Sequence, residues 1–304
     1  MTDRRLHLDR RALLLVVLCT VVWGFGQLAS KVALAQIPPL TQAGLRSAGA
    51  ALLVMAWARY RRIPLWEKDG TLVPGLIAGL LFAVEFAAVY TGLRHTTAGR
   101  LTVFLYLAPF VVAIGMAFIS RAERLSPRAT VGLLVAFAGV GIAFAEGFSA
   151  GPAMPQQWLG DALGVFAAVG WGATTLVIRA SSLAPVDPAK TLLYQLGISG
   201  IGLPIAGWLA GERIATPLSG LSIGSLLFQI VVVSSASYLV WFWLVRTYAA
   251  ARLSAFTLLT PIIALLAGAA LLSEPLTPRI GVAALAVAVG LVAVNAGPRR
   301  RRDA

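Results

Sequence analysis

The sequence predicts an all-α integral membrane protein, with ten transmembrane helices arranged as two inverted five-helix repeats around a central cavity. Hydrophobic residues make up 59% of the 304 residues and charged residues only 12%, a composition that soluble domains do not have. The apolar residues form segments of about 20 residues, the length that a helix needs to cross a bilayer. One half of the chain also resembles the other half, which is typical of secondary transporter folds.

Two motifs carry the internal repeat. Trp23–Lys31 (WGFGQLASK) returns about 150 residues later as Trp171–Arg179 (WGATTLVIR), and Glu123–Arg128 (ERLSPR) returns as Glu274–Arg279 (EPLTPR). Because each half has five spans, an odd number, the second copy must cross the membrane in the opposite sense to the first. Two such copies are related by an axis in the membrane plane, and the solute site is expected between them.

Polar loops and prolines, which stop or start helices, delimit the ten spans. The spans are expected at 12–35, 40–58, 73–93, 98–120, 127–146, 157–180, 188–210, 221–246, 251–272 and 278–297. The chain then divides into a cytoplasmic tail at 1–11, a first repeat at 12–146, an external linker at 147–156, a second repeat at 157–297 and a basic cytoplasmic tail at 298–304. The first apolar run is too long for a secretory signal and contains Gln27, Ser30 and Lys31, so we expect an uncleaved span.

The distribution of basic residues predicts the orientation. With ten spans, both tails and the even-numbered loops lie on one side, and most of the 25 lysines and arginines fall there. Basic residues gather on the cytoplasmic side of membrane proteins. We therefore expect a multi-pass protein of a bacterial inner (plasma) membrane, with both termini in the cytoplasm.

Composition also excludes several classes of function. The formal charge of +13 comes from short basic clusters between apolar segments, so the expected partner is the lipid bilayer and not nucleic acid. One cysteine, Cys19, and two histidines, His7 and His95, argue against a disulfide framework and a metal site. The sequence has no catalytic constellation or phosphate-cradling loop at useful spacing. We expect no enzyme activity, no cofactor and no metal.

Polar and aromatic residues within the spans indicate where a solute would pass, because such side chains turn away from lipid. Candidate substrate-binding residues share helical faces, at i, i+3 or i+4 spacing, on the first, third, sixth and eighth spans, and the fourth span adds a tyrosine. They are Trp23, Gln27, Phe82, Glu85, Phe86, Tyr106, Trp171, Thr175, Ser237, Tyr238 and Trp241. The rings have a second interpretation as bundle core, and a serine in a span often bonds only the backbone four residues back.

Glu85 and Arg46 are the charged residues within the spans that need an explanation. An unpaired carboxylate in the membrane is costly and tends to take up a proton. One interpretation is an Arg46–Glu85 ion pair that fastens two helices. The others are functional: Glu85 is a proton site or meets a solute ammonium, and Arg46 binds a solute carboxylate.

Short motifs in both halves suggest a family. They are Trp23-Gly24 with Lys31, Leu107–Pro109 before Glu123–Ser126, and Leu259–Pro261 before Ser273–Thr277. In their order they resemble the drug/metabolite transporter superfamily, specifically its ten-helix EamA branch. Within that branch, Leu81–Glu85 and Tyr106 are similar to the aromatic amino acid exporters (YddG-like). This resemblance implies a basket-shaped bundle with a central cavity open to each side in turn and with the fifth and tenth spans peripheral.

The leading hypothesis is a secondary transporter that exports small amphipathic metabolites, above all aromatic or bulky apolar amino acids, by alternating access. The solute side chain would stack on the aromatic rings, its ammonium would approach Glu85, and its carboxylate would approach Arg46 or the polar donors of Gln27 and the serines. One alternative is a proton-coupled exporter of cationic drugs or other metabolites. Another, of a different class, is a non-transporting membrane scaffold or lipid-handling protein. We expect a monomer or a weak oligomer.

Overall fold

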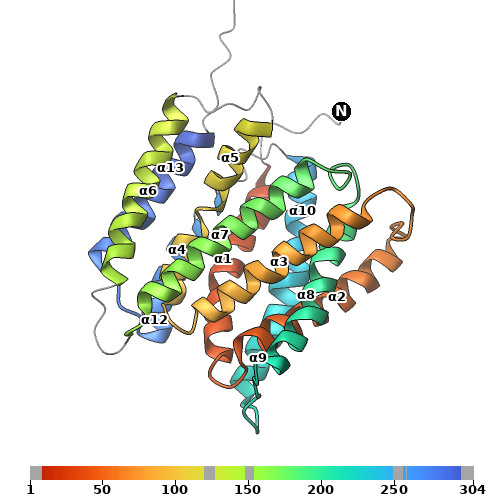
Figure 1. Ribbon diagram of the computed structural model, residues 1–304, viewed down its shortest axis with the longest axis horizontal. Coiled ribbons are helices and arrows are strands. Elements are labelled where there is room, and N and C mark those ends of the chain that lie inside the picture. The colour runs from red at the N-terminus through yellow and green to blue at the C-terminus, as the bar shows by residue number, and fades with distance from the viewer. Residues whose placement is uncertain (1–8, 120–126, 148–153, 249–255, 258, 296–304) are drawn as a thin grey trace, which may run out of the picture.

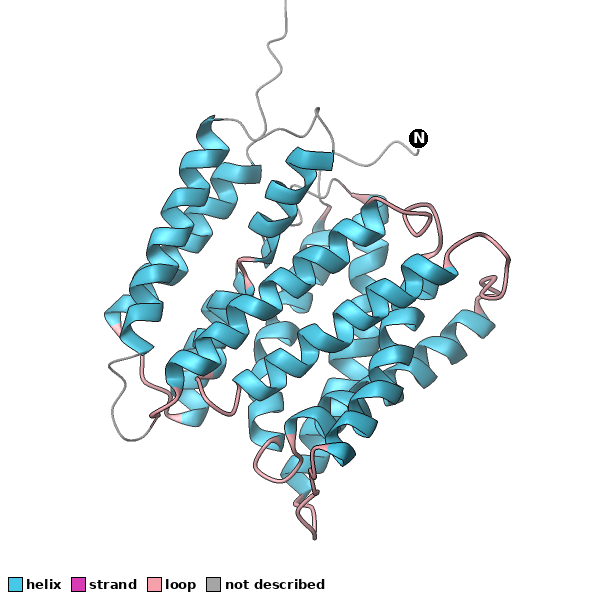
Figure 2. Cartoon of the chain, in the orientation of Figure 1, coloured by secondary structure: helices cyan, strands magenta, loops and turns pink. Residues whose placement is uncertain are grey.

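The computed structural model describes residues 9–119, 127–147, 154–248, 256, 257 and 259–295, and within these ranges the chain forms helices joined by loops (Figure 2). The helices are α1 (Arg10–Ala33), α2 (Pro39–Tyr60), α3 (Leu72–Gly92), α4 (Ala98–Leu105), α5 (Ala108–Ile119), α6 (Pro127–Gly147), α7 (Gln157–Arg179), α8 (Pro188–Leu209), α9 (Gly220–Phe228), η2 (Gln229–Ser237), α10 (Tyr238–Thr247), α12 (Leu259–Leu272) and α13 (Pro278–Asn295). Where described, their outer bounds agree with the predicted spans to within a few residues. Glu123, most of both tails and linker residues 148–153 lie outside the described residues.

Six helical stretches in the described part of the chain are long and apolar enough to cross a membrane, and shorter apolar helices accompany them. The α2 helix is not among the six, although its 22 residues have a length of about 33 Å. The reason lies in its composition, because Gln42, Arg46 and Ser47 lower its hydropathy and all three are buried. Polar residues that weaken the membrane signal of α2 are therefore turned into the protein.

Small residues allow the helices to approach closely, as they do in other membrane helix bundles. The α2 and α8 helices pack along each other, and a Cβ placed on Gly200 would lie 2.7 Å from the backbone nitrogen of Ala48. The α6 and α13 helices form a similar pair, with Gly139 against Ala286. This pair lies at one edge of the bundle, whereas α3 and α7 pack together across its middle (Figure 1).

Two predicted spans are not regular α-helices. The fourth is broken at Tyr106 and Leu107, between α4 and α5, because Pro109 has no N–H to bond the carbonyl of Leu105. The eighth contains the π-helix η2 between α9 and α10. Backbone hydrogen bonds in a π-helix join residues five apart, and both irregular segments lie next to predicted site residues.

Candidate functional site

Arg46 of α2 lies in the centre of the bundle with only 3% of its surface exposed. Its Nε donates a hydrogen bond to Ser234 Oγ of η2, and its Nη2 donates to the Tyr238 hydroxyl at 3.4 Å. The guanidinium also lies 4.0 Å from the ring centroid of Phe86 on α3. Within the described residues no carboxylate oxygen comes within 4.0 Å of Arg46. A buried cation is thus held by hydroxyls and rings, without a counterion.

Glu85 of α3 is equally enclosed, with 5% of its surface exposed. It faces α7 at Gly170, where a Cβ would lie 3.2 Å from the Cβ of Glu85. In the part of the chain that is described, Glu85 has neither a salt bridge nor a hydrogen bond. Electrostatic interactions link Glu85 directly with Arg46, and both residues with Tyr238. The two charges therefore share one region but do not form the ion pair that one interpretation of the sequence expected.

A cluster of indole rings borders this region on the side of α1 and α10. Trp23 packs edge-on against Trp241, with ring centroids 5.2 Å apart and an interplanar angle of 74°. The indole N–H of Trp23 donates to Ser237 Oγ at 2.8 Å. Trp23, Trp241 and Ser237, predicted from two separate spans, are thus brought into contact.

A second group of rings comes from α3, α4 and α7. Tyr106, at the end of α4, packs edge-on against Trp171 with a centroid distance of 6.0 Å. Phe82 and Phe86 lie one turn apart on α3 with centroids 4.5 Å apart. Phe86 and Tyr238 both pack against the hydrophobic cluster that contains Phe82. These rings and the first cluster together supply large apolar surfaces around the two charges.

The remaining predicted residues make mostly local contacts. The hydroxyl of Thr175 donates to the Trp171 carbonyl at 3.0 Å, within its own helix. Ser237 also donates to its own helix, at Val233, although it accepts from Trp23 as well. Gln27 lies half-buried on α1, one turn beyond Trp23.

Sequence reasoning missed several buried polar residues beside Arg46. Tyr90 of α3 donates its hydroxyl to Gln229 Oε1 at 2.6 Å, and Gln42 of α2 contacts the same glutamine. Thr260 of α12 is buried, and its hydroxyl has no hydrogen-bond partner among the described residues. Gln42 lies four residues before Arg46 and therefore on the same face of α2. The sequence could have identified it, because it is an amide inside an apolar segment.

Another set of charges ties the two halves together at one end of the bundle, and we call it the latch. Arg100 of α4 pairs with Asp161 at 2.6 Å and with Glu146 at 2.7 Å. Lys31 of α1 pairs with Glu274 at 3.5 Å. Glu274 also accepts from the Ala98 backbone N–H at 2.8 Å, which caps the N-terminus of α4. The latch charges are paired, whereas Arg46 and Glu85 are not.

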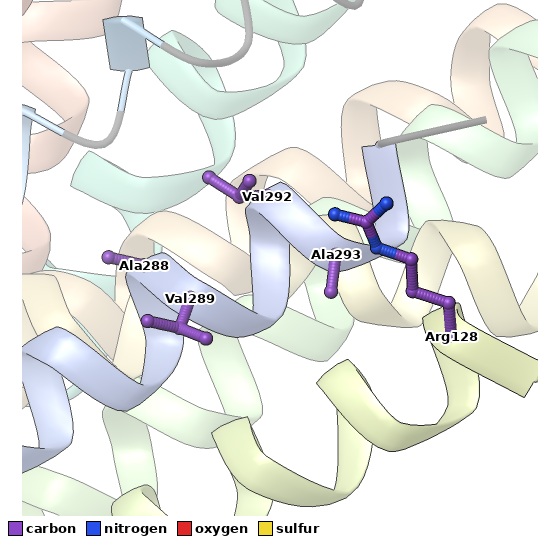
Figure 3. A pocket seen from close by; sticks show the side chains of 5 residues that line it. All are labelled: Arg128, Ala288, Val289, Val292 and Ala293. Carbon is purple, nitrogen blue, oxygen red and sulfur yellow. The ribbon is translucent and has the colours of Figure 1, made fainter. Parts of the chain in front are cut away.

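An open groove of about 430 Å³ lies far from these residues, on the α6–α13 pair. Arg128, Ala288, Val289, Val292 and Ala293 line it, and Figure 3 shows them along α13 and at the start of α6. Its lining is apolar apart from Arg128, so it is a lipid-facing surface feature. Among the predicted central residues, Arg46, Phe82, Glu85, Tyr106 and Ser237 are buried, and the others are half-buried.

Known proteins resemble this chain in both sequence and fold. The sequence pattern of the EamA-like transporter family matches residues 10–145 and again residues 158–296. An uncharacterised transporter of Bacillus subtilis (strain 168), YvbV, is 29% identical over 99% of this chain and 96% of its own length. A probable amino-acid metabolite efflux pump of Salmonella typhimurium (strain LT2) is also 29% identical, over 98% of this chain and 99% of its own. A solved crystal structure with 20% identity has a TM-score of 0.66 and covers 97% of this chain and 98% of that chain, which supports the fold.

Proposed function

The chain belongs to the EamA-like transporter family, and from this premise we propose that it exports amino acids with aromatic or bulky apolar side chains. The family and the names of its relatives indicate a multi-pass membrane transporter and not an enzyme. The family therefore argues against the alternative function that the sequence left open, a non-transporting membrane scaffold or lipid-handling protein. Relatives of matching length include a probable amino-acid metabolite efflux pump, which favours an amino-acid substrate here.

One observation carries the substrate class: the centre holds a buried cation, Arg46, and a buried carboxylate, Glu85, that do not pair. Burying either charge alone costs several kcal/mol, so folding gives no reason to keep both apart. A zwitterion placed between them supplies what each lacks. Its carboxylate meets the Arg46 guanidinium in a charge-assisted hydrogen bond, and its ammonium meets Glu85.

The rings around the charges select the side chain. Trp23 packs edge-on against Trp241, and Tyr106 packs edge-on against Trp171. Each additional aromatic contact contributes about 0.5–1.5 kcal/mol beyond the burial of area. Phenylalanine, tryptophan and similar amino acids are therefore the preferred solutes.

The transport cycle is alternating access between two inverted repeats. The double match of one family pattern to the two halves supports the repeat, and so do the pairings of α2 with α8 and of α6 with α13, which are corresponding helices of each half. In the orientation predicted by the basic residues, both termini are cytoplasmic in a bacterial inner membrane and the latch is external. The latched conformation is then closed to the outside.

Counterflow in proteoliposomes tests this function. Vesicles loaded with phenylalanine should accumulate labelled phenylalanine, and external phenylalanine should compete. Phenethylamine lacks the carboxylate and 3-phenylpropionate lacks the ammonium, so each should compete at least about 30-fold more weakly, the effect of losing one buried charge partner. Equal competition by either analogue would reject the two-charge site, and absence of counterflow with any amino acid would reject the substrate class.

The second candidate is a proton-coupled exporter of cationic drugs, which the unpaired Glu85 favours. In that case phenethylamine should compete better than phenylalanine, and efflux should depend on an imposed pH gradient. The buried charge of Arg46 speaks against it, because a cationic solute would meet a like charge in the same enclosure.

A further inference from the structure

A second polar layer lies one helical turn from Arg46, toward the latch. On α2, Gln42 precedes Arg46 by four residues, and on α3, Tyr90 follows Phe86 by four. On the π-helix η2, Gln229 precedes Ser234 by five residues, the spacing of the backbone hydrogen bonds and slightly more than one turn. The layer formed by Gln42, Tyr90 and Gln229 is therefore stacked on the Arg46 layer, about 5.4 Å away.

The layer is fully enclosed, with 0% of Gln42 and 1% of Gln229 exposed. Gln42 Nε2 donates to the Ser30 carbonyl at 3.0 Å and to Gln229 Oε1 at 3.3 Å. Gln229 Oε1 also accepts from the Tyr90 hydroxyl at 2.6 Å. These bonds fix the two amides, because turning Gln42 over would set its oxygen against the Ser30 carbonyl.

Each amide keeps one atom without a partner. Within the described residues, neither Gln42 Oε1 nor Gln229 Nε2 has a hydrogen bond. Leaving a buried donor or acceptor unsatisfied is unfavourable. A hydrogen bond joins the two amides, so the free acceptor and the free donor belong to neighbouring side chains.

We propose that Gln42 and Gln229 form a subsite for a neutral hydroxyl or carboxamide on the side chain of the transported solute. Such a group both donates and accepts, so it satisfies Gln42 Oε1 and Gln229 Nε2 at once. A carboxylate only accepts and an ammonium only donates, so either ion would leave one amide atom unsatisfied. The subsite therefore admits a neutral polar side chain and disfavours charged ones.

This inference rests on the proposed function, because it places the solute carboxylate at Arg46. From there, a side-chain amide about 5 Å away reaches the second layer, which matches the length of glutamine. The rings around Trp23 and Trp171 remain available to aromatic side chains. The polar subsite thus adds amino acids with a side-chain amide or hydroxyl to the aromatic ones.

The test compares glutamine with its apolar isostere, 2-amino-5-methylhexanoate, as competitors of labelled phenylalanine counterflow. The wild-type protein should prefer glutamine by about tenfold, the effect of two neutral hydrogen bonds. In Gln42→Met and in Gln229→Met this preference should fall to near one, while competition by the isostere changes less than about twofold. Ser47→Ala is the matched control, because Ser47 is a buried polar residue of the same helix whose hydroxyl accepts from Ser199 outside the layer.

The outcomes separate the two proposals. Phenylalanine counterflow without a preference for glutamine in the wild type would overturn the subsite alone, and this measurement needs no variant to fold. An equal loss of both competitors in the glutamine variants would also overturn it, because that is the result of a purely structural role. No counterflow with any amino acid would overturn the proposed function and the subsite with it.

Discussion

Arg46, which we propose binds the solute, can be compared directly with Arg100, which lies in the latch. Both arginines lie in membrane-embedded helices, and both are 3% exposed. Arg100 is bonded to Asp161 and Glu146, whereas Arg46 is bonded to the hydroxyls of Ser234 and Tyr238. We predict that Arg100→Gln destabilises the protein strongly and that Arg46→Gln does not.

The expected changes in the free energy of unfolding follow from the groups that each arginine contacts. Removing Arg100 leaves the buried Asp161 without its counterion, which costs about 3–5 kcal/mol. Removing Arg46 loses two hydrogen bonds to a charged group, at about 1.5–3 kcal/mol each, and a cation–π contact of about 2 kcal/mol. It also removes a desolvation penalty of several kcal/mol. These contributions oppose each other, so we expect Arg46→Gln to destabilise the protein less than Arg100→Gln does.

For transport we expect the opposite order, with a larger effect of Arg46→Gln than of Arg100→Gln on solute binding. If Arg46 binds the solute carboxylate, its loss costs at least about 2 kcal/mol of binding free energy, which is about 30-fold in affinity. Thermal unfolding of the purified variants in detergent and competition of labelled phenylalanine counterflow measure the two quantities, with Arg46→Lys to retain the charge. The reasoning is wrong if Arg46→Gln unfolds as early as Arg100→Gln, or if it binds phenylalanine normally.

Three further predictions concern other residues. Glu85→Gln should weaken competition by phenylalanine about 30-fold and leave 3-phenylpropionate unchanged; an equal loss for both would contradict an ammonium site. Trp241→Ala should reduce the preference for phenylalanine over leucine by roughly 2- to 13-fold, which the same competition assay measures; an unchanged preference would remove Trp241 from the site. Asp69 lies in the loop before α3, and hydrogen bonds from Lys190 and Thr71 lower its pKa from 3.8 to about 2. The stability that this carboxylate contributes is therefore present above about pH 4 and is lost as the pH falls toward 2. Over that range the melting temperature should fall more in the wild type than in Asp69→Asn, and parallel curves would refute the linkage.

Much of the fold is predictable from the sequence because lipid imposes a strong constraint. Backbone groups in a bilayer must bond internally, so apolar segments of the right length become helices. The departures are local and have chemical causes. Pro109 breaks the fourth span, and the π-helix at Gln229–Ser237 interrupts the eighth. Hydropathy reports neither, since both depend on backbone hydrogen bonding and not on average polarity.

The sequence identified the buried charges of the candidate site but not the residues that they contact. The rule that polar side chains face away from lipid selects Arg46 and Glu85, and both are buried. It does not say that Arg46 turns to Ser234 and Tyr238, because that choice depends on side-chain geometry across three elements. The contact between Gln42 and Gln229 was missed for a related reason, since the two residues lie in different halves of the chain.

The charged latch is well suited to a gate that opens in every cycle. In the proposed rocking motion, Lys31 separates from Glu274 and Arg100 from Asp161, because each pair joins the two halves. The attraction lost is offset by the hydration that all four charges regain, since a buried ion pair gains little over its desolvation penalty. An apolar seal of the same area would expose hydrocarbon to water at about 25 cal/mol per Å². Ion pairs that are specific in the closed state and hydrated in the open state therefore lower the barrier to opening in the proposed cycle.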